Sequence, residues 1–137
     1  MSSNENKKNV QRIIDSYNRN RLEIIDELFD KNYVYHGIGE ESQASRDEWK
    51  MFLQKMRKAF PDQKVYIHDL VAEGDKVAYR MTVEGTHGGE LQGIPPTGRK
   101  VTIQTVGIMK FKDGKLVEEW EIYDLMGMLG QVGALRA

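Results

Sequence analysis

Residues 101–124, VTIQTVGIMKFKDGKLVEEWEIYD, decide the fold of this chain. The pair Asp113-Gly114 stands between two β-prone runs, and an Asp-Gly pair in that position is a strong short-range signal for a hairpin turn. We therefore predict one long strand over residues 101–112 and an antiparallel partner over residues 116–124.

Residues 64–83 continue this pattern on the N-terminal side. Their side chains follow a period of two from position 65 to 71 and again from 77 to 83, and Gly74-Asp75 makes a turn between the two runs. A period of two is typical of strands. Because the segment 85–99 is rich in Gly and Pro, we expect a loop there and an antiparallel meander of four consecutive strands overall.

The chain before residue 64 has a helical pattern. Apolar residues at i, i+3, i+4 and i+7 over positions 10–17 predict a first helix, and residues 22–29 predict a short second one. A brief β-prone run follows at 33–36. Ser45 and Glu48 have the spacing of a capping box, which predicts the start of a third helix. Pro61 disfavours helix at the residue before it and so ends that helix.

Helices grouped ahead of an antiparallel meander indicate an α+β fold rather than a doubly wound parallel sheet. The length of 137 residues suits one domain, residues 1–137. The chain has no Cys, which excludes disulfides and thiolate metal sites and favours a cytoplasmic setting.

Charge and hydropathy argue against two classes of partner. The 20 Lys and Arg residues and 21 Asp and Glu residues are spread over both halves, so we expect no basic surface for nucleic acid. No apolar run approaches the roughly 20 residues of a membrane span, so we expect no membrane partner.

The last predicted strand offers a candidate acid–base group. Its two faces hold Trp120, Ile122 and Asp124 on one side and Val117, Glu119, Glu121 and Tyr123 on the other. If the first set faces the core, Asp124 ends an apolar row, where a carboxyl group suits general acid or base catalysis. The alternative is that Asp124 caps the turn that follows at 125–129.

Other polar residues allow two interpretations each. Arg80 shares a strand face with Glu84, and it either holds a substrate oxygen or orients Asp124, or it belongs to an exposed cross-strand charge pair. The three His residues lack the spacing of a helical metal pair, and Cys is absent, so no metal site is expected. The isolated His36 ends a β-prone run, where it is either a pocket residue or a structural one.

The order and spacing of several short motifs resemble the SnoaL-like polyketide cyclase family of the nuclear-transport-factor-two-like superfamily. The resemblance extends from about the first helix to Gln131. The motifs are Ala59-Phe-Pro-Asp62, Ala72-Glu-Gly-Asp75, Gly85-Thr-His-Gly-Gly-Glu90, Gly93-Ile-Pro-Pro-Thr-Gly-Arg99, Asp113-Gly-Lys115, and Glu119-Trp120 followed by Asp124, Met128-Leu129 and Gln131.

This resemblance implies a cone-shaped α+β barrel, in which a strongly bent, mainly antiparallel sheet wraps around three N-terminal helices and a deep apolar pocket. It also implies a homodimer formed through the outer face of the sheet. That interface would account for the apolar row of Val77, Tyr79, Met81 and Val83.

The resemblance further implies an enzyme of the lyase, isomerase or cyclase type that closes a ring in a polyketide-like ketone by an intramolecular aldol reaction. The reaction would use no metal and no cofactor. Asp124 matches the position of the family's catalytic Asp on the last strand. We expect His36, Arg80 and Gln104 as hydrogen-bond donors in the pocket and Trp120 as an apolar wall, with a small apolar molecule as the ligand.

Two alternatives remain open. The first is a non-catalytic, small-molecule-binding dimer of the same fold. The second is epoxide hydrolysis, for which Asp69, Arg80 and Asp124 supply the residue types of an Asp–Arg–Asp arrangement.

Overall fold

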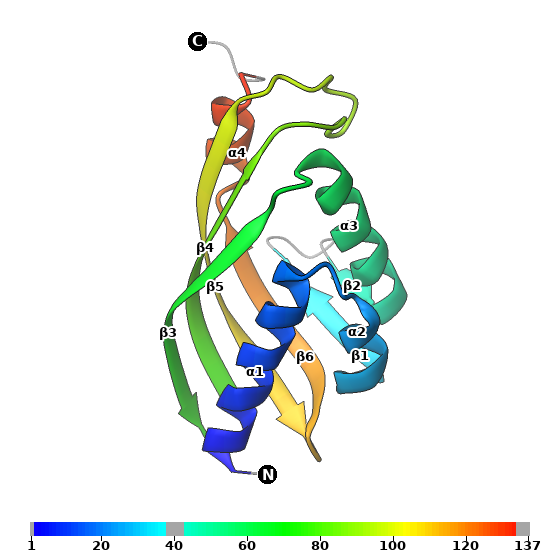
Figure 1. Ribbon diagram of the computed structural model, residues 1–137. Coiled ribbons are helices and arrows are strands. Elements are labelled where there is room, and N and C mark those ends of the chain that lie inside the picture. Colours follow the sequence, from blue (N-terminus) through cyan, green and yellow to red (C-terminus); the bar gives the residue numbers. More distant parts are fainter. Residues whose placement is uncertain (1, 38–42, 134–137) are drawn as a thin grey trace.

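The computed structural model describes residues 2–37 and 43–133. This part of the chain forms four helices and six strands (Figure 1). In chain order they are α1 (Ser3–Asn18), α2 (Glu23–Leu28), β1 (Phe29–His36), β2 (Gln43–Ser45), α3 (Arg46–Ala59), β3 (Lys64–Glu73), β4 (Lys76–Thr86), β5 (Lys100–Lys112), β6 (Lys115–Tyr123) and α4 (Leu125–Gln131).

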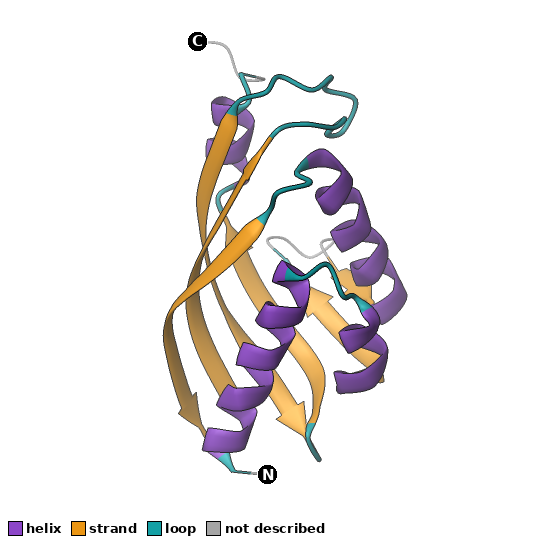
Figure 2. Ribbon diagram, in the orientation of Figure 1, coloured by secondary structure: helices purple, strands orange, loops and turns teal. Residues whose placement is uncertain are grey.

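All six strands belong to one sheet with the order β2-β1-β6-β5-β4-β3. The β1–β6 pair is parallel and the other pairs are antiparallel. The predicted meander of four strands is confirmed, because β3 to β6 are neighbours in sequence order. The α+β class with a strongly curved, mainly antiparallel sheet is also confirmed, although the sheet is not closed and keeps β2 and β3 as its edges (Figure 2).

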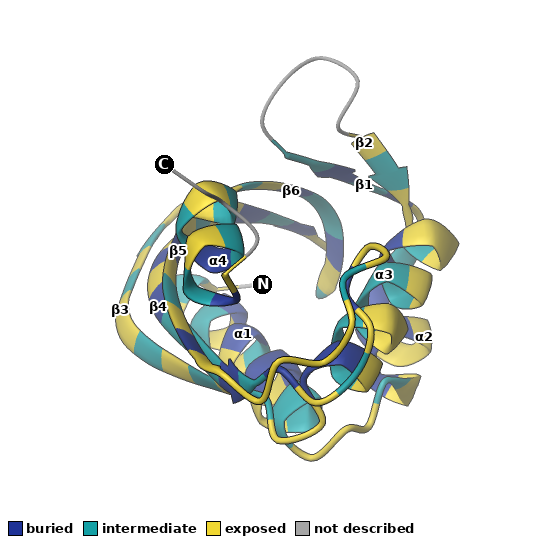
Figure 3. Cartoon of the chain, turned by 90° about the horizontal axis from the view of Figure 1, so that it is seen from above, coloured by how far each residue is buried: buried dark blue, intermediate teal, exposed yellow. Residues whose placement is uncertain are grey.

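The sheet curls in an arc from β3 to β2, with α1, α2 and α3 on its concave side (Figure 3). The Asp113-Gly114 turn joins β5 to β6 as predicted. Both turn residues have positive φ, 52° and 79°, which is the conformation that a tight two-residue hairpin requires.

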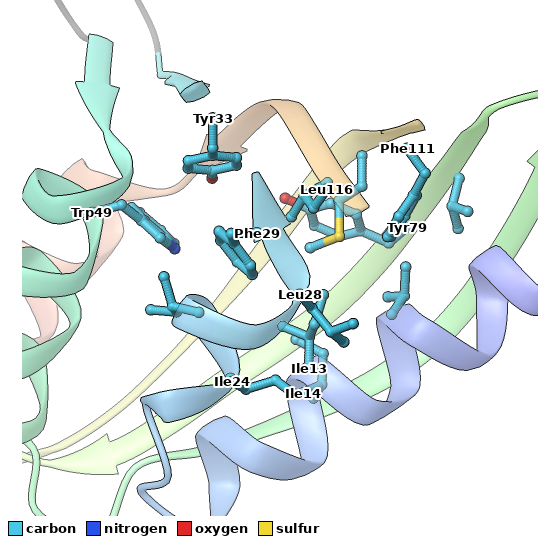
Figure 4. Packing of buried hydrophobic residues seen from close by; sticks show 14 of the residues in the cluster. Ile13, Ile14, Ile24, Leu28, Phe29, Tyr33, Trp49, Tyr79, Phe111 and Leu116 are labelled. Atoms are coloured by element: carbon cyan, nitrogen blue, oxygen red, sulfur yellow. The ribbon is translucent and has the colours of Figure 1, made fainter. Parts of the chain in front are cut away.

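The third helix begins at its predicted capping box, and the first helix buries its predicted apolar face, although it begins earlier than the pattern at 10–17 indicates, at Ser3. Ser45 Oγ accepts from Glu48 N at 3.2 Å and Glu48 Oε1 accepts from Ser45 N at 3.0 Å, so the capping box is formed. The apolar face of α1 is buried against strand side chains, and Figure 4 shows Ile13 and Ile14 pointing towards them. These contacts hold the helices against the concave face of the sheet.

The apolar row of β4 faces inward, which corrects one expectation. Val77, Tyr79 and Met81 are 0%, 4% and 2% exposed. They pack in the core on the concave side and therefore do not form an outer dimer surface.

Two elements have little sequence signal. Strand β2 has only three residues and pairs with the end of β1. Helix α4 contains Gly127 and Gly130, which have low helix propensity, yet it buries Met128 against the main body. In residues 2–37 and 43–133, no helix combines the length and apolar composition needed to cross a membrane.

Candidate active site

A cavity of about 100 Å³ lies between the concave face of the sheet and helices α1 and α3. Most of its lining is apolar, with large flexible side chains such as Met56, Met81 and Met109. Met side chains are flexible and adapt to a bound molecule, and ligand pockets are typically lined by apolar and aromatic side chains. The polar side chains that reach the cavity are Tyr17, Gln63, Tyr79, Thr105, Glu119, Glu121 and Tyr123.

A second hollow of about 250 Å³ lies beside this cavity and shares Trp49, Phe52 and Tyr123 with it. Its other walls come from the ends of β1 and β2 and the start of α4, including Tyr35 and Leu125. Because three side chains line both spaces, the second hollow adjoins the cavity.

Two carboxyl groups on β6 face the cavity. Glu119 and Glu121 are two residues apart, so the alternation of the strand directs both to the same side. Glu119 is only 2% exposed, and Glu121 is partly buried. Burial of charged groups is costly unless they are hydrogen-bonded, so their partners determine whether this arrangement is stable.

Each carboxyl oxygen of Glu119 has a tyrosine hydroxyl within hydrogen-bonding distance. Tyr33 Oη donates to Oε1 at 2.9 Å, and Tyr79 Oη lies 2.7 Å from Oε2. Tyr33 comes from β1 and Tyr79 from β4, so strands on both sides of β6 hold this carboxyl group. The site is therefore assembled from segments that are far apart in sequence.

Glu121 has three hydroxyl partners. Tyr35 Oη donates to Oε1 at 2.9 Å, and Thr105 Oγ1 donates to Oε2 at 2.9 Å. Tyr79 Oη also lies 2.9 Å from Oε2 of Glu121. One tyrosine hydroxyl thus joins the two carboxyl groups.

Burial raises the pKa of Glu119 to about 8, and the negative charge of Glu121 adds to this rise. The hydrogen bonds from Tyr79 and Tyr33 oppose the rise in part, because they stabilise the ionised form. Burial, followed by the charge of Glu119, raises the pKa of both Tyr33 and Tyr79. Near neutral pH, Glu119 therefore keeps its proton while the tyrosines remain hydrogen-bond donors.

A partly buried carboxylate beside a protonated carboxylic acid can accept one proton and donate another. Environments that separate the protonation states of two neighbouring carboxyl groups are typical of acid–base catalysis. Among the described residues that line the cavity, none is Lys, Arg or His. In the same described part of the chain, no group of three His, Asp or Glu side chains is placed to hold a metal ion.

Asp124 lies elsewhere. It is exposed, and its Oδ1 accepts a 2.8 Å hydrogen bond from the N–H of Gly127 as the N-cap of α4. The expectation that its carboxyl group projects into the cavity is wrong, and the capping interpretation is confirmed. A catalytic role for Asp124 stays a prediction.

His36 and Trp120 are together, but outside the cavity. They are paired across β1 and β6, and their rings stack with centroids 5.4 Å apart. His36 Nε2 is also 2.7 Å from Glu118 Oε2. Trp120 is 37% exposed and gains its apolar contact from this stacking, so its placement as a pocket wall is wrong.

Arg80 and Gln104 are exposed on the outer face of the sheet. Arg80 Nε donates to Asp69 Oδ2 at 2.7 Å, with side chains that are 48% and 57% exposed. Arg80 and Asp69 thus form an exposed cross-strand charge pair, which confirms the structural interpretation of Arg80. The Asp–Arg–Asp arrangement for epoxide hydrolysis is not assembled in the cavity.

The sequence interpretation placed the wrong face of β6 inside. Trp120 and Ile122 made one face look like the core side, whereas the face with Glu119 and Glu121 is the inner one. A usable signal lies in Tyr33, Tyr35 and Tyr79 on the strands β1 and β4. Their hydroxyls are the hydrogen-bond partners that carboxyl groups on the inner face of the sheet need.

The model of the SnoaL-like polyketide cyclase family matches residues 7–132, and the chain belongs to this family. The nogalonic acid methyl ester cyclase of Streptomyces nogalater is 27% identical over 129 residues, which are 88% of this chain and 92% of that protein.

Two crystal structures share the fold along nearly the whole chain. AclR from Streptomyces galilaeus, described as "a putative hydroxylase", is 32% identical with a TM-score of 0.90, and the match covers 98% of this chain and 100% of that one. IdmH from Streptomyces antibioticus, described as "a putative polyketide cyclase", is 31% identical with a TM-score of 0.82, covering 93% and 97%.

Proposed function

We propose that this protein closes a ring in a polyketide-like ketone by acid–base catalysis, with Glu121 as the base and Glu119 as the acid. The observation that carries the proposal is the pair of carboxyl groups facing one mainly apolar cavity. Membership of a polyketide cyclase family supports the reaction class. The assignment to these two residues rests on their burial and hydrogen bonds.

The reaction needs two proton movements and no electron transfer. Glu121 removes a proton from a carbon between two carbonyl groups, and the electron pair left behind forms the new C–C bond at a ketone carbon. Glu119 gives its proton to the oxygen of that ketone, which becomes a hydroxyl group. A carbon acid flanked by two carbonyls is acidic enough for a carboxylate in a dry cavity, so the chemistry needs no cofactor.

The charge of the cavity favours a substrate without a carboxylate near the reacting carbon. Two acidic side chains and no basic one occur among its described lining residues. An anionic group would lose its hydration there without gaining a cationic partner. A methyl ester removes that charge, in agreement with the name of the relative that acts on nogalonic acid methyl ester.

The direct test is the conversion of nogalonic acid methyl ester and its free acid, followed by liquid chromatography and mass spectrometry. We expect a cyclic product of unchanged mass from the ester and at least tenfold slower conversion of the acid. A simple β-keto ester in D₂O provides a second probe. Wild type should speed deuterium exchange at its central carbon, and E121Q should not.

Binding of these esters without turnover or deuterium exchange would contradict catalysis and support the non-catalytic, small-molecule-binding alternative. The outcome is clear because binding can be measured separately by calorimetry. The E121Q variant keeps the size of the side chain, so loss of exchange with retained ester binding would assign the base.

The 32% identity to AclR favours hydroxylation as a second candidate. Glu121 would remove the same proton, dioxygen would oxidise the carbon, and an external two-electron reductant would reduce the second oxygen atom to water. Hydroxylation adds 16 mass units and incorporates ¹⁸O when ¹⁸O₂ is supplied. Ring closure leaves the mass unchanged and incorporates no ¹⁸O from ¹⁸O₂. One mass spectrum therefore separates the two reactions.

A further inference from the structure

Tyr79 reaches the two glutamates by lying across the strand between them. Its own strand is β4, and the glutamates are on β6, so β5 separates the two. The residue paired with Tyr79 on β5 is Gly107, and Gly107 is paired with Glu121 on β6. The tyrosine ring therefore crosses β5 at a glycine.

A side chain at position 107 would occupy the place of this ring. A Cβ atom built on Gly107 would be 2.4 Å from Tyr79 Oη and 2.5 Å from Tyr79 Cζ. It would also be 2.3 Å from the carbonyl oxygen of Trp120. Contacts below 3 Å between such atoms do not occur in stable packing, so the ring and the β6 backbone would have to move.

The backbone conformation does not explain this glycine. Gly74, Gly93, Gly98, Gly114 and Gly133 have positive φ, but Gly107 does not. Strand conformation at Gly107 is accessible to any residue, and glycine in the interior of a strand weakens it. The close approach of Tyr79 and the β6 backbone is therefore the reason that position 107 has no side chain.

The Tyr79 hydroxyl has one proton for two acceptors. It lies 2.7 Å from Glu119 Oε2 and 2.9 Å from Glu121 Oε2. If both contacts are hydrogen bonds, the second proton must come from one of the carboxyl groups. One arrangement gives each of these groups a hydrogen-bond partner. Glu119 O–H donates to Tyr79 Oη, and Tyr79 O–H donates to Glu121. Tyr33 donates to the other oxygen of Glu119.

We propose that Gly107 is a positioning residue, which lets Tyr79 join Glu119 and Glu121 into one unit that passes a proton from either carboxyl group to the other. This inference rests on the proposed function. After ring closure, Glu121 holds the substrate proton and Glu119 has lost its own. Glu121 then donates its proton to Tyr79 Oη as the Tyr79 O–H proton moves to Glu119, which leaves Tyr79 neutral and restores both glutamates.

The other ionisable groups near Glu119 do not provide this route. The groups whose pKa values are affected by Glu119, or that affect its own, are Tyr17 of α1, Tyr33 and Tyr35 of β1, Tyr79 of β4 and Glu121 of β6. Tyr33 is hydrogen-bonded to Glu119 and Tyr35 to Glu121, each to one carboxyl group. In the described part of the chain, Tyr79 is the side chain with hydrogen-bonding distances to both.

The first test needs no substrate. Glutamate labelled with ¹³C at the carboxyl carbon is incorporated into the full chain, and the signals of Glu119 and Glu121 are assigned with E119Q and E121Q. In wild type, the Glu119 titration should have a midpoint near 8. Loss of the hydroxyl in Y79F should raise this midpoint. Once Glu119 has lost its proton, Tyr79 can donate its O–H to the carboxylate, and this hydrogen bond stabilises the ionised form.

G107A should also raise the midpoint of the Glu119 titration. When G107A is combined with Y79F, the midpoint should be the same as in Y79F alone. Gln104→Ala, an exposed change on the same strand, is the matched control and should leave the midpoint unchanged. If G107A does not fold, the Y79F titration still decides the position of the hydroxyl. An unchanged Glu119 midpoint in folded G107A or in Y79F would overturn the proposal.

The second test separates proton return from a merely structural effect. With nogalonic acid methyl ester as the probe, the ratio of steady-state kcat to the single-turnover rate should fall at least tenfold in Y79F, because only repeated turnover needs the proton returned. An equal fall in both rates would overturn the relay. If E121Q abolishes activity while the Glu119 titration is unaltered in Y79F, the proposed function survives and the relay alone fails.

Discussion

The N–H of Gly127 donates a 2.8 Å hydrogen bond to Oδ1 of Asp124, and this contact begins helix α4. A Cβ atom at Gly127 would be 2.1 Å from Oδ2 of Asp124, so the glycine makes room for the carboxyl group. Asp124 is therefore the N-cap of α4. This structural role explains the residue without any role in proton transfer.

Substitutions of Asp124 distinguish capping from catalysis. Asn is as good an N-cap as Asp, whereas Ala loses the hydrogen bond and costs about 1 kcal/mol of stability. We therefore expect D124N to retain wild-type stability and activity within about threefold, and D124A to be destabilised in urea unfolding. A fall of about 100-fold or more in the activity of folded D124N would assign the catalytic role to Asp124 after all.

Substitution of either cavity-facing glutamate should remove most of the activity. E119Q cannot give a proton to the ketone oxygen, and E121Q cannot accept one from carbon. Each should lower kcat by about 10²- to 10⁴-fold, the usual contribution of a general acid or base. Glu118→Gln, on the outer face of the same strand, is the matched control. Wild-type rates in both E119Q and E121Q would exclude this site.

The raised pKa of Glu119 predicts how stability changes with pH. The ordinary pKa of the side chain, 4.5, applies to the unfolded chain and about 8 to the folded one. Between these values the folded protein holds a proton that the unfolded chain has released. The contribution of Glu119 is thus fully present below about pH 4.5 and is lost as pH rises through about 8.

The free energy of unfolding should therefore fall between pH 5 and 8, by up to about 1.4 kcal/mol per pH unit from this group. Urea unfolding at several pH values measures the slope. E119Q carries no ionisable group at this position and should have a slope that is flatter by this amount. Identical slopes in wild type and E119Q would show that Glu119 titrates normally.

We propose that the outer face of the sheet pairs two copies of the chain, although through different residues from those expected at first. Val106 is paired with Ile122, and Ile108 with Trp120, and all four are exposed by 37% to 59%. Together they form an apolar cluster on neighbouring strands, which is the usual mark of a binding surface.

A charge in this cluster should separate the two copies. I108K is expected to halve the mass measured by light scattering after gel filtration. Met51→Lys, an equally drastic change at an exposed position on α3, should leave the mass unchanged. A monomeric wild-type chain at micromolar concentration would contradict the dimer.

Local sequence determined most of the elements of this fold. The Asp113-Gly114 turn, the capping box at Ser45 and the periods of two and 3.6 residues depend on neighbours within a few positions, so they are visible without the tertiary structure. The same information was enough to group the helices against an antiparallel meander and to indicate the family.

Only the tertiary structure decided which face of β6 points inward. Alternation states which residues share a face, but it does not state which face is buried. Two glutamates can occupy the inner face because Tyr33 and Tyr79 approach them from strands 86 and 40 residues away. That compensation offsets the cost of burying carboxyl groups, and it exists only once the sheet has formed and Gly107 has left room for the ring of Tyr79.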